Sequence, residues 1–390
     1  MLKLENDKLT QRGIKSVHLK QIYLNALKSG TTSRRQLKKE LHLSAPSVCA
    51  LVDEMIGCGL LAETGTAEAS GRGRPCTKLQ VVPGVDVIPV VSLCEDGFEA
   101  FLFDICANQL EHQHLYVEFP PSQAEGSYCC LEPSQWIAPI LEWVDAIKKT
   151  YRPLALLLSL CGSIHNGFFT SSVLHIKVQQ EFLTLLKEKT GLEVFTGNNA
   201  SFFAYEEKQF QPDSSDFIFI VIENGVGAGI IRDGEIFGDG EFRAGEIGHI
   251  SIDYQGRSCI CGNRGCLEQY VSIPAISADF GSSFDDICNA YQNGDPAVAK
   301  LIDEKASQLA IGINNILCMH PTERIILGGQ IKSLGPAFLS CLQEKVSTSG
   351  MRKLMDRITL EYSRSESYGD IHGALWNYFD HVMRIDDLMK

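Results

Sequence analysis

Three short segments near the start of the chain repeat the apolar spacing of an amphipathic helix. In each, apolar residues return every three or four positions, which is the period of one helix face. Ser29-Gly30 ends the first segment, and Ser44 offers the third a side-chain oxygen as its N-cap. A polar stretch and an extended segment follow. The expected helices are Val17–Leu27, Arg34–Leu41 and Ser44–Ile56, and the extended segment is Thr77–Val82.

Three helices and two extended segments within residues 1–80 predict a winged helix-turn-helix domain. In this arrangement the third helix enters the major groove of DNA, and the helix before it lies near the phosphates. The candidates for base contact are therefore the side chains at the start of the third helix, and the candidates for phosphate contact are basic residues of the second. The first set is Ser44, Ala45, Ser47 and Cys49, and the second set is Arg34, Arg35, Lys38 and Lys39.

The distribution of charge favours nucleic-acid binding by this part of the chain alone. The whole chain has a net charge of −13, yet residues 1–80 contain 13 Lys and Arg against 7 Asp and Glu. Within them, the glycine-rich stretch Ser70–Pro75 presents Arg72 and Arg74, which suit a narrow minor groove. The acidic remainder would itself repel DNA. A solvated basic helix could explain the charge alone, and a plain linker could explain the glycine-rich stretch alone. The two features together favour double-stranded DNA as a partner.

Residues 81–390 alternate strands and helices, as in an α/β body with covered sheets. Paired strands are expected at 87–93 and 98–105, joined by Glu95-Asp96-Gly97, and a fully apolar strand at Leu154–Leu160. The other expected elements are a strand within 106–118, helices Trp136–Lys149 and Lys177–Lys189, a strand at 192–196, a helix near 200–208, a hairpin of Phe217–Ile222 and Gly227–Ile231, helices near 296–318 and 335–347, and a strand at Arg324–Leu327.

Length and composition fit an ordered chain with more than one domain. The chain has 390 residues, 44% of them hydrophobic, and single cores stop growing at roughly 250–300 residues. Met1–Thr10 lacks the apolar stretch of a secretory signal, and the longest apolar run, Leu154–Cys161, is far shorter than the roughly 20 residues of a membrane helix. We therefore expect no membrane contact, a cytoplasmic location, and reduced thiols for most of the 14 cysteines.

One group of cysteines is set apart by its spacing. His249, Cys259, Cys261 and Cys266 fall within eighteen residues and could supply the four ligands of a tetrahedral zinc ion. The glycines between the cysteines allow the loop to fold around an ion. Because protein side chains would fill all four positions, the expected zinc is structural. The alternative is a coincidental group of reduced thiols.

The zinc cluster belongs to a longer motif that resembles the ROK family of repressors, open reading frames and kinases. The motif runs from Gly245-Glu-Ile-Gly-His249 to Cys259-x-Cys-Gly-x-x-Gly-Cys-Leu-Glu268. Further similar segments are Gly225–Gly229, Pro321–Gly329 and Gly197–Ala200, and the winged helix with its Gly-Arg-Pro ending resembles the repressor branch. The resemblance implies an actin- and hexokinase-like body of two lobes, at about 81–197 and about 198–375, followed by a C-terminal helix at 375–390.

The same resemblance implies a sugar-binding site in the cleft between the lobes. Its ligands would be Asn198, Asn199, Glu246, His249 and Glu268. Carboxylates can accept paired hydrogen bonds from sugar hydroxyls, and amides can both donate and accept. His249 is implied twice, with one ring nitrogen on zinc and the other toward a sugar hydroxyl. Zinc would then hold the binding wall in place without touching the sugar.

Three departures from the family's kinases argue against phosphoryl transfer. Asn199 stands where the kinases have the Asp that takes the proton from the attacking hydroxyl, and an amide cannot act as that base. The stretch Val85–Val90 lacks the Gly and Thr of the kinases' phosphate turn, and Pro89 removes a backbone donor there. Glu223-Asn224-Gly225 lacks the usual Thr before its glycine. We therefore expect no enzymatic activity.

Together these inferences predict a sugar-responsive DNA-binding repressor that acts as a homodimer or a higher homo-oligomer. Two-fold symmetry would place the recognition helices on half-sites about 10 base pairs, or multiples of that distance, apart, which predicts a palindromic operator. Two other hypotheses are an active sugar kinase with a fused DNA-binding domain and a repressor controlled by a protein partner. The identity of the sugar and the direction of its effect on DNA binding stay open.

Overall fold

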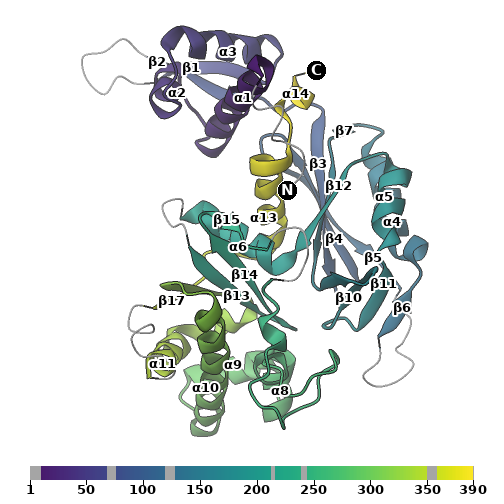
Figure 1. Cartoon of the computed structure of the whole chain (residues 1–390), viewed down its shortest axis with the longest axis vertical. Coiled ribbons are helices and arrows are strands. Elements are labelled where there is room, and N and C mark those ends of the chain that lie inside the picture. Colours follow the sequence, from purple (N-terminus) through teal and green to yellow (C-terminus); the bar gives the residue numbers. More distant parts are fainter. Residues whose placement is uncertain are drawn as a thin grey trace.

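A computed structural model describes residues 10–67, 76–118, 128–211, 216–238, 244–348 and 358–389. The chain forms a small N-terminal head and a larger body that contains two main β-sheets (Figure 1). The mixed α/β architecture and the two-lobed body predicted from the sequence are confirmed. Among the helices described, none is long and apolar enough to cross a membrane.

The head consists of three helices followed by an antiparallel pair of strands, in the predicted order. A hydroxyl side chain caps the start of each helix by accepting a hydrogen bond from the backbone N–H three residues later. The capping residues are Thr10, Ser33 and Ser44. The predicted wing residues Arg72 and Arg74 lie outside the described residues. The elements are α1 (Gln11–Lys28), α2 (Arg34–Glu40), α3 (Ala45–Gly57), β1 (Leu61–Ala67) and β2 (Cys76–Val81).

The two main sheets of the body repeat one strand order, so the lobes are structurally equivalent. In each sheet three consecutive strands form an antiparallel meander. Two further strands lie beside the first strand of the meander and run parallel to it. The first sheet contains β5 (Gln109–Tyr116), β4 (Gly97–Asp104), β3 (Asp86–Cys94), β8 (Leu156–Leu160) and β12 (Val194–Asn198), with β7 (Arg152–Pro153) beside β3. The second contains β15 (Glu235–Ile236), β14 (Val226–Arg232), β13 (Phe217–Ile222), β16 (Arg324–Gly328) and β17 (Thr359–Tyr362).

Each sheet is covered by helices that bury an apolar face. Trp136, Ile140 and Phe182 pack with the first sheet, and Leu309 and Ile313 pack with the second. Burial of a side chain of this size contributes about 1.5–3 kcal/mol to folding. The covering helices are α4 (Pro133–Ile147) and α5 (Glu181–Thr190) on the first sheet, and α7 (Glu268–Val271), α8 (Ile273–Phe280), α9 (Phe284–Gln292), α10 (Pro296–Met319) and α11 (Gly335–Thr348) on the second.

A third sheet of four short strands corrects one expectation. The helix expected over Lys177–Lys189 begins only at Glu181, because Ile176–Gln179 forms a strand in which Ile176 and Val178 are buried. This alternation has the period of a strand, but it is too short to be distinguished from the adjoining helix by pattern alone. The strands are β6 (Cys129–Leu131), β11 (Ile176–Gln179), β10 (Phe168–Ser171) and β9 (Ser163–His165).

Helices α6 (Asn199–Phe210) and α13 (Gly369–Asn377) pack closely against each other. A Cβ atom on Gly373 would lie 1.8 Å from the carbonyl oxygen of Phe202, so only glycine allows this approach. α6 also contacts strands of both main sheets, whereas α13 contacts β3 and β8 of the first. The two helices therefore connect the lobes at the base of the cleft.

The prediction of a single C-terminal helix at 375–390 is wrong. The helix begins earlier, at Gly369, and after Asn377 it continues as a π-helical turn, Tyr378–Val382. Met383 and Arg384 are extended, and a short helix, α14 (Ile385–Leu388), follows. This interruption lets Phe379, Met383, Ile385 and Leu388 all reach the apolar core that they share with the head.

Candidate functional site

A cavity of about 460 Å³ opens between the lobes, bordered by elements of both main sheets. All five residues predicted to bind a sugar line it, although they come from three separate parts of the chain. Asn198 and Asn199 lie at the junction of β12 and α6, Glu246 and His249 lie in the segment after β15, and Glu268 begins α7. The structure therefore brings the predicted set together.

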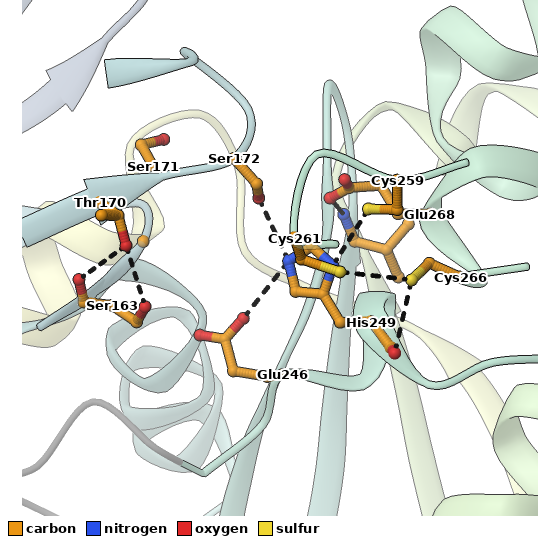
Figure 2. Close-up of polar contacts among 12 residues, drawn as sticks. Ser163, Thr170, Ser171, Ser172, Glu246, His249, Cys259, Cys261, Cys266 and Glu268 are labelled. Carbon is orange, nitrogen blue, oxygen red and sulfur yellow. Dashed lines mark hydrogen bonds and ion pairs between the residues drawn. The ribbon is translucent and has the colours of Figure 1, made fainter. Parts of the chain in front are cut away.

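His249 lies between the cavity and the cysteine cluster (Figure 2). Its Nε2 atom is 3.2 Å from the Ser172 hydroxyl and 3.9 Å from a Glu246 carboxylate oxygen. Its Nδ1 atom is 3.6 Å from the Cys259 sulfur. One ring nitrogen thus points toward the cysteines and the other toward the cavity, which is the geometry that the double role of His249 requires.

The cysteine cluster fits a single tetrahedral ion. One donor atom from each of His249, Cys259, Cys261 and Cys266 lies within 4.8 Å of all the others, and the sulfur atoms of Cys261 and Cys266 are 3.6 Å apart. Zinc bonds of about 2.0–2.3 Å place tetrahedral donors about 3.3–3.8 Å apart. Burial raises the pKa of the Cys259 and Cys266 thiols, so thiolate ligands at these positions need a bound cation to stabilise them.

The loop that carries the cysteines also positions the cleft wall. Gly265 has a left-handed backbone with φ of +67°, and a Cβ atom there would lie 1.7 Å from the Asp253 carbonyl oxygen. The backbone N–H of Leu267 donates to Ile250 at 2.9 Å, which ties the loop to the segment that carries His249. Glu268 follows directly, and its carboxylate accepts a bond from the Val226 N–H at 3.3 Å.

The two amides of the predicted set have different surroundings. The Asn198 side chain caps α6 by accepting from the Ala200 N–H at 2.9 Å, and it donates to the Gly162 carbonyl at 3.1 Å. Its orientation is therefore set by the fold. Asn199 is the first residue of α6 and lines the cavity, and its side-chain oxygen also accepts from the Ala200 N–H at 2.9 Å.

Glu223 and Asp370 also line the cavity, although the sequence analysis did not predict either as a site residue. Asp370 is buried and accepts hydrogen bonds from the Ser92 and Ser159 hydroxyls, each at 2.5 Å. Burial raises the pKa of the Glu223 and Asp370 carboxyl groups, and the charge of Asp370 raises that of Glu223 further. An acid in the first turn of a helix and an acid before a hairpin glycine are common, so neither position stands out in the sequence.

The cavity is strongly acidic. The lining that the structure describes contains six carboxylates and one histidine, with no Lys or Arg among those residues. Burial raises the pKa of the Glu246 and Glu268 carboxyl groups as well. Such a wall suits hydroxyl donors, whereas an added phosphate would meet charges of the same sign in a partly desolvated space.

In the head, the predicted base-contacting residues are exposed at the start of α3. Ser44, Ala45, Ser47 and Cys49 all reach the surface, although the Ser44 oxygen also caps the helix. Arg34 differs from the expectation of a phosphate contact, because its guanidinium pairs with Asp53 and Glu63, each at 2.6 Å. Arg35, Lys38 and Lys39 are exposed on α2 and are better placed to meet a phosphate.

Comparison with solved structures supports the architecture. The crystal structure of a ROK family transcriptional regulator, a homologue of the E. coli MLC protein, superposes with a TM-score of 0.78 at 24% identity, covering 96% of this chain and 99% of that chain. A ROK hexokinase from Thermus thermophilus superposes with a TM-score of 0.57 at 20% identity, covering 74% and 96% respectively. The body therefore has the two-lobed fold that these structures share.

The sequence places the chain more narrowly. Residues 133–377 match the ROK family, and the chain belongs to this family. It is 25% identical over 354 residues to the xylose repressor of Bacillus subtilis, covering 87% of this chain and 88% of that protein. It is also 25% identical over 373 residues to the N-acetylglucosamine repressor of Escherichia coli O157:H7, covering 90% and 89%.

Proposed function

We propose that this protein is a transcriptional repressor that binds double-stranded DNA through its head and a neutral sugar in the cleft of its body. The similarity to sugar-named repressors over nearly the whole chain supports this function. The observation that carries it is a continuous segment, residues 369–388, that begins in the cleft and ends against the head. In this proposal the protein is cytoplasmic, residues 1–80 are the DNA-binding domain, and residues 81–390 are the sugar-binding body with lobes at about 81–197 and 198–375.

DNA recognition would follow the winged helix-turn-helix scheme. α3 would enter the major groove with Ser44, Ala45 and Ser47 near the bases, while Arg35, Lys38 and Lys39 on α2 would lie toward the phosphates. Arg72 and Arg74 would serve the minor groove. A homodimer or higher homo-oligomer would present two such heads to a palindromic operator.

Sugar recognition would use the carboxylates and amides of the cavity. Asn198, Asn199, Glu246, His249 and Glu268 would bind the hydroxyl groups, and the acidic lining favours an unphosphorylated sugar. A structural zinc ion held by His249, Cys259, Cys261 and Cys266 would supply a fixed orientation for the His249 ring.

The segment 369–388 gives the sugar a physical route to the DNA-binding head. Asp370 lines the cavity at the start of α13, and α13 packs against α6, which begins at the sugar-binding amides. Further along, the Lys20 ammonium on α1 donates to the Met383 carbonyl at 2.9 Å, and the Ser16 hydroxyl donates to Asp386 at 3.0 Å. A sugar that alters the packing of α6 and α13 would therefore move α1 and the head with it.

Breaking this contact should uncouple the two sites. In the double variant Ser16→Ala, Lys20→Ala, sugar affinity and sugar-free DNA affinity should stay within about twofold of the unmodified protein. The effect of sugar on DNA affinity, commonly about 5–150-fold for coupled sites, should shrink toward onefold. DNA binding followed by fluorescence anisotropy, with and without sugar, measures this. Lys15→Ala is the control, because Lys15 lies on the same helix but pairs with Glu54 inside the head. An unchanged sugar response in the double variant would refute this route.

We also propose that the protein does not phosphorylate the sugar. The amide of Asn199 cannot accept the hydroxyl proton, and the strand that holds Pro89 runs straight through the expected phosphate turn. The Glu223 side chain occupies the nucleotide side of the cleft, where a Cβ atom on Gly329 would lie 2.7 Å from its Cγ. A polyphosphate there would face the carboxyl groups of the half-buried Glu223 and the buried Asp370.

Restoring the base alone should not create a kinase. Asn199→Asp should show no sugar-dependent formation of ADP above background, because the phosphate side of the cleft stays acidic. The measurement is a coupled ADP assay on protein that is shown to bind the sugar. Sugar-dependent ADP release by the unmodified protein would contradict the proposal and favour the kinase hypothesis.

A further inference from the structure

A second cluster of metal-ligating side chains lies at the edge of the first sheet, away from the Cys3His group. β3 ends at Cys94, the β3–β4 turn carries Asp96, and β5 carries His114. In the antiparallel register, Glu99 of β4 faces His114 of β5. These residues belong to three adjoining pieces of one sheet, so the backbone hydrogen bonds of the sheet fix their separation.

The three donors are already spaced for a common ion. One atom each of Cys94, Asp96 and His114 lies within 4.8 Å of the other two. A carboxylate oxygen of Asp96 is 3.1 Å from His114 Nε2 and 3.9 Å from the Cys94 sulfur. Tetrahedral coordination with bonds of about 2.0–2.3 Å requires donors about 3.3–3.8 Å apart, so only small side-chain shifts are needed.

The His114 ring is oriented as a metal ligand would be. Its Nδ1 atom is 2.9 Å from a Glu99 carboxylate oxygen, and the other oxygen of Glu99 is 2.6 Å from His112 Nε2. A carboxylate that accepts from Nδ1 leaves Nε2 as the lone-pair nitrogen. That Nε2 atom is buried, and it has no hydrogen-bond partner among the described residues, since its approach to Asp96 lacks hydrogen-bond geometry.

We propose that Cys94, Asp96 and His114 form a second metal site, with Glu99 as the residue that orients His114. A thiolate, an imidazole and a carboxylate together suit a divalent transition ion, and zinc is the expected one. Three protein ligands leave a fourth position for water or an added ligand. Cys94 and Glu99 also line the cleft, so the ion lies at its rim. This inference does not depend on the sugar or on DNA binding.

Metal stoichiometry of the full-length protein tests the proposal. Chelator-treated protein is titrated with Co²⁺, whose thiolate charge-transfer and d–d absorption bands report coordination, and zinc content is measured by mass spectrometry after reloading. We expect two ions per chain in the unmodified protein. Cys94→Ser and His114→Ala should each lose one ion, and Cys261→Ser should lose the other. Cys106→Ser, which alters another half-buried thiol close to the same sheet, should keep both.

Asp96→Asn distinguishes loss of the ion from loss of folding, because Asp96 is exposed and its substitution disturbs no core packing. It should weaken the second ion by at least about tenfold while the circular dichroism spectrum stays unchanged. A single ion per chain that is lost in Cys261→Ser and kept in Cys94→Ser would overturn the proposal. Retention of the second ion by both Cys94→Ser and His114→Ala would also overturn it.

Discussion

Cys261→Ser is expected to remove about one zinc ion per chain and to abolish sugar binding. Cys261 is exposed, so replacing its sulfur by oxygen changes little packing, and any loss of stability reports the metal. Structural zinc sites of this kind contribute on the order of 10 kcal/mol of binding free energy at neutral pH, which is folding free energy for the loop. Without the ion, the segment from Glu246 to Glu268 loses the anchor that holds the cleft wall.

Zinc content, thermal unfolding and sugar titration by calorimetry measure the three consequences of this substitution together. Cys318→Ser is the matched control, because Cys318 is also an exposed cysteine but lies on α10, outside the cluster. The control should bind zinc and sugar as the unmodified protein does. If Cys261→Ser binds sugar normally after losing its zinc, the ion has no part in forming the cleft wall.

Glu246→Gln is expected to weaken sugar binding by about 10–100-fold. The substitution keeps the shape of the side chain but removes the charge, and a hydrogen bond to a charged group contributes about 1.5–3 kcal/mol. Glu246 lies beside His249 at the cavity wall, so the lost charge faces the ligand. DNA affinity in the absence of sugar should not change, because the substitution is in the body.

Calorimetric titration with neutral sugars and their phosphate esters measures this effect and the class of ligand at once. Glu193→Gln serves as the control, because that carboxylate is exposed and pairs with Lys187 away from the cavity. The unmodified protein should prefer the neutral sugar, since the described cleft lining offers an ester phosphate no Lys or Arg. Tighter binding of the phosphate ester would contradict the proposed ligand class.

The parts of this structure that depend on short-range sequence signals were predictable. The helices of the head begin at hydroxyl N-caps that stand directly before them, as at Ser33 and Ser44. The Cys3His cluster occupies eighteen consecutive residues, so its spacing alone indicated a metal site. The hairpin at Phe217–Ile222 was equally clear, because its strand is apolar throughout.

The parts that depend on long-range packing were not predictable. Asp370 meets the hydroxyls of Ser92 and Ser159 across 278 and 211 residues, and no local pattern marks any of the three. The contact between Lys20 and Met383 spans 363 residues in the same way. The prediction of a helix from Lys177 failed for a different reason. Over so short a run, the two buried residues Ile176 and Val178 fit the period of a strand and the period of a helix equally well.

Arg34 and His114 each have interaction partners that the sequence did not indicate. Arg34 is basic and lies on the predicted phosphate-facing helix, yet the fold uses it to pair with Asp53 and Glu63. His114 belongs to the strand expected within 106–118, and the orientation of its ring depends on Glu99 of the neighbouring strand. In both cases the chemistry of the side chain was evident from the sequence, but its partner was not.

The coupling of sugar and DNA binding is best measured by fluorescence anisotropy of purified protein with DNA from its own promoter region. The titration is run at a stated salt concentration, with a scrambled duplex as the control and a panel of neutral sugars as effectors. We expect tight binding to the promoter DNA, at least about a hundredfold weaker binding to the scrambled duplex, and a change in promoter affinity with one of the sugars. A DNA affinity that is the same for the promoter and the scrambled duplex, and that no sugar changes, would contradict the proposed function.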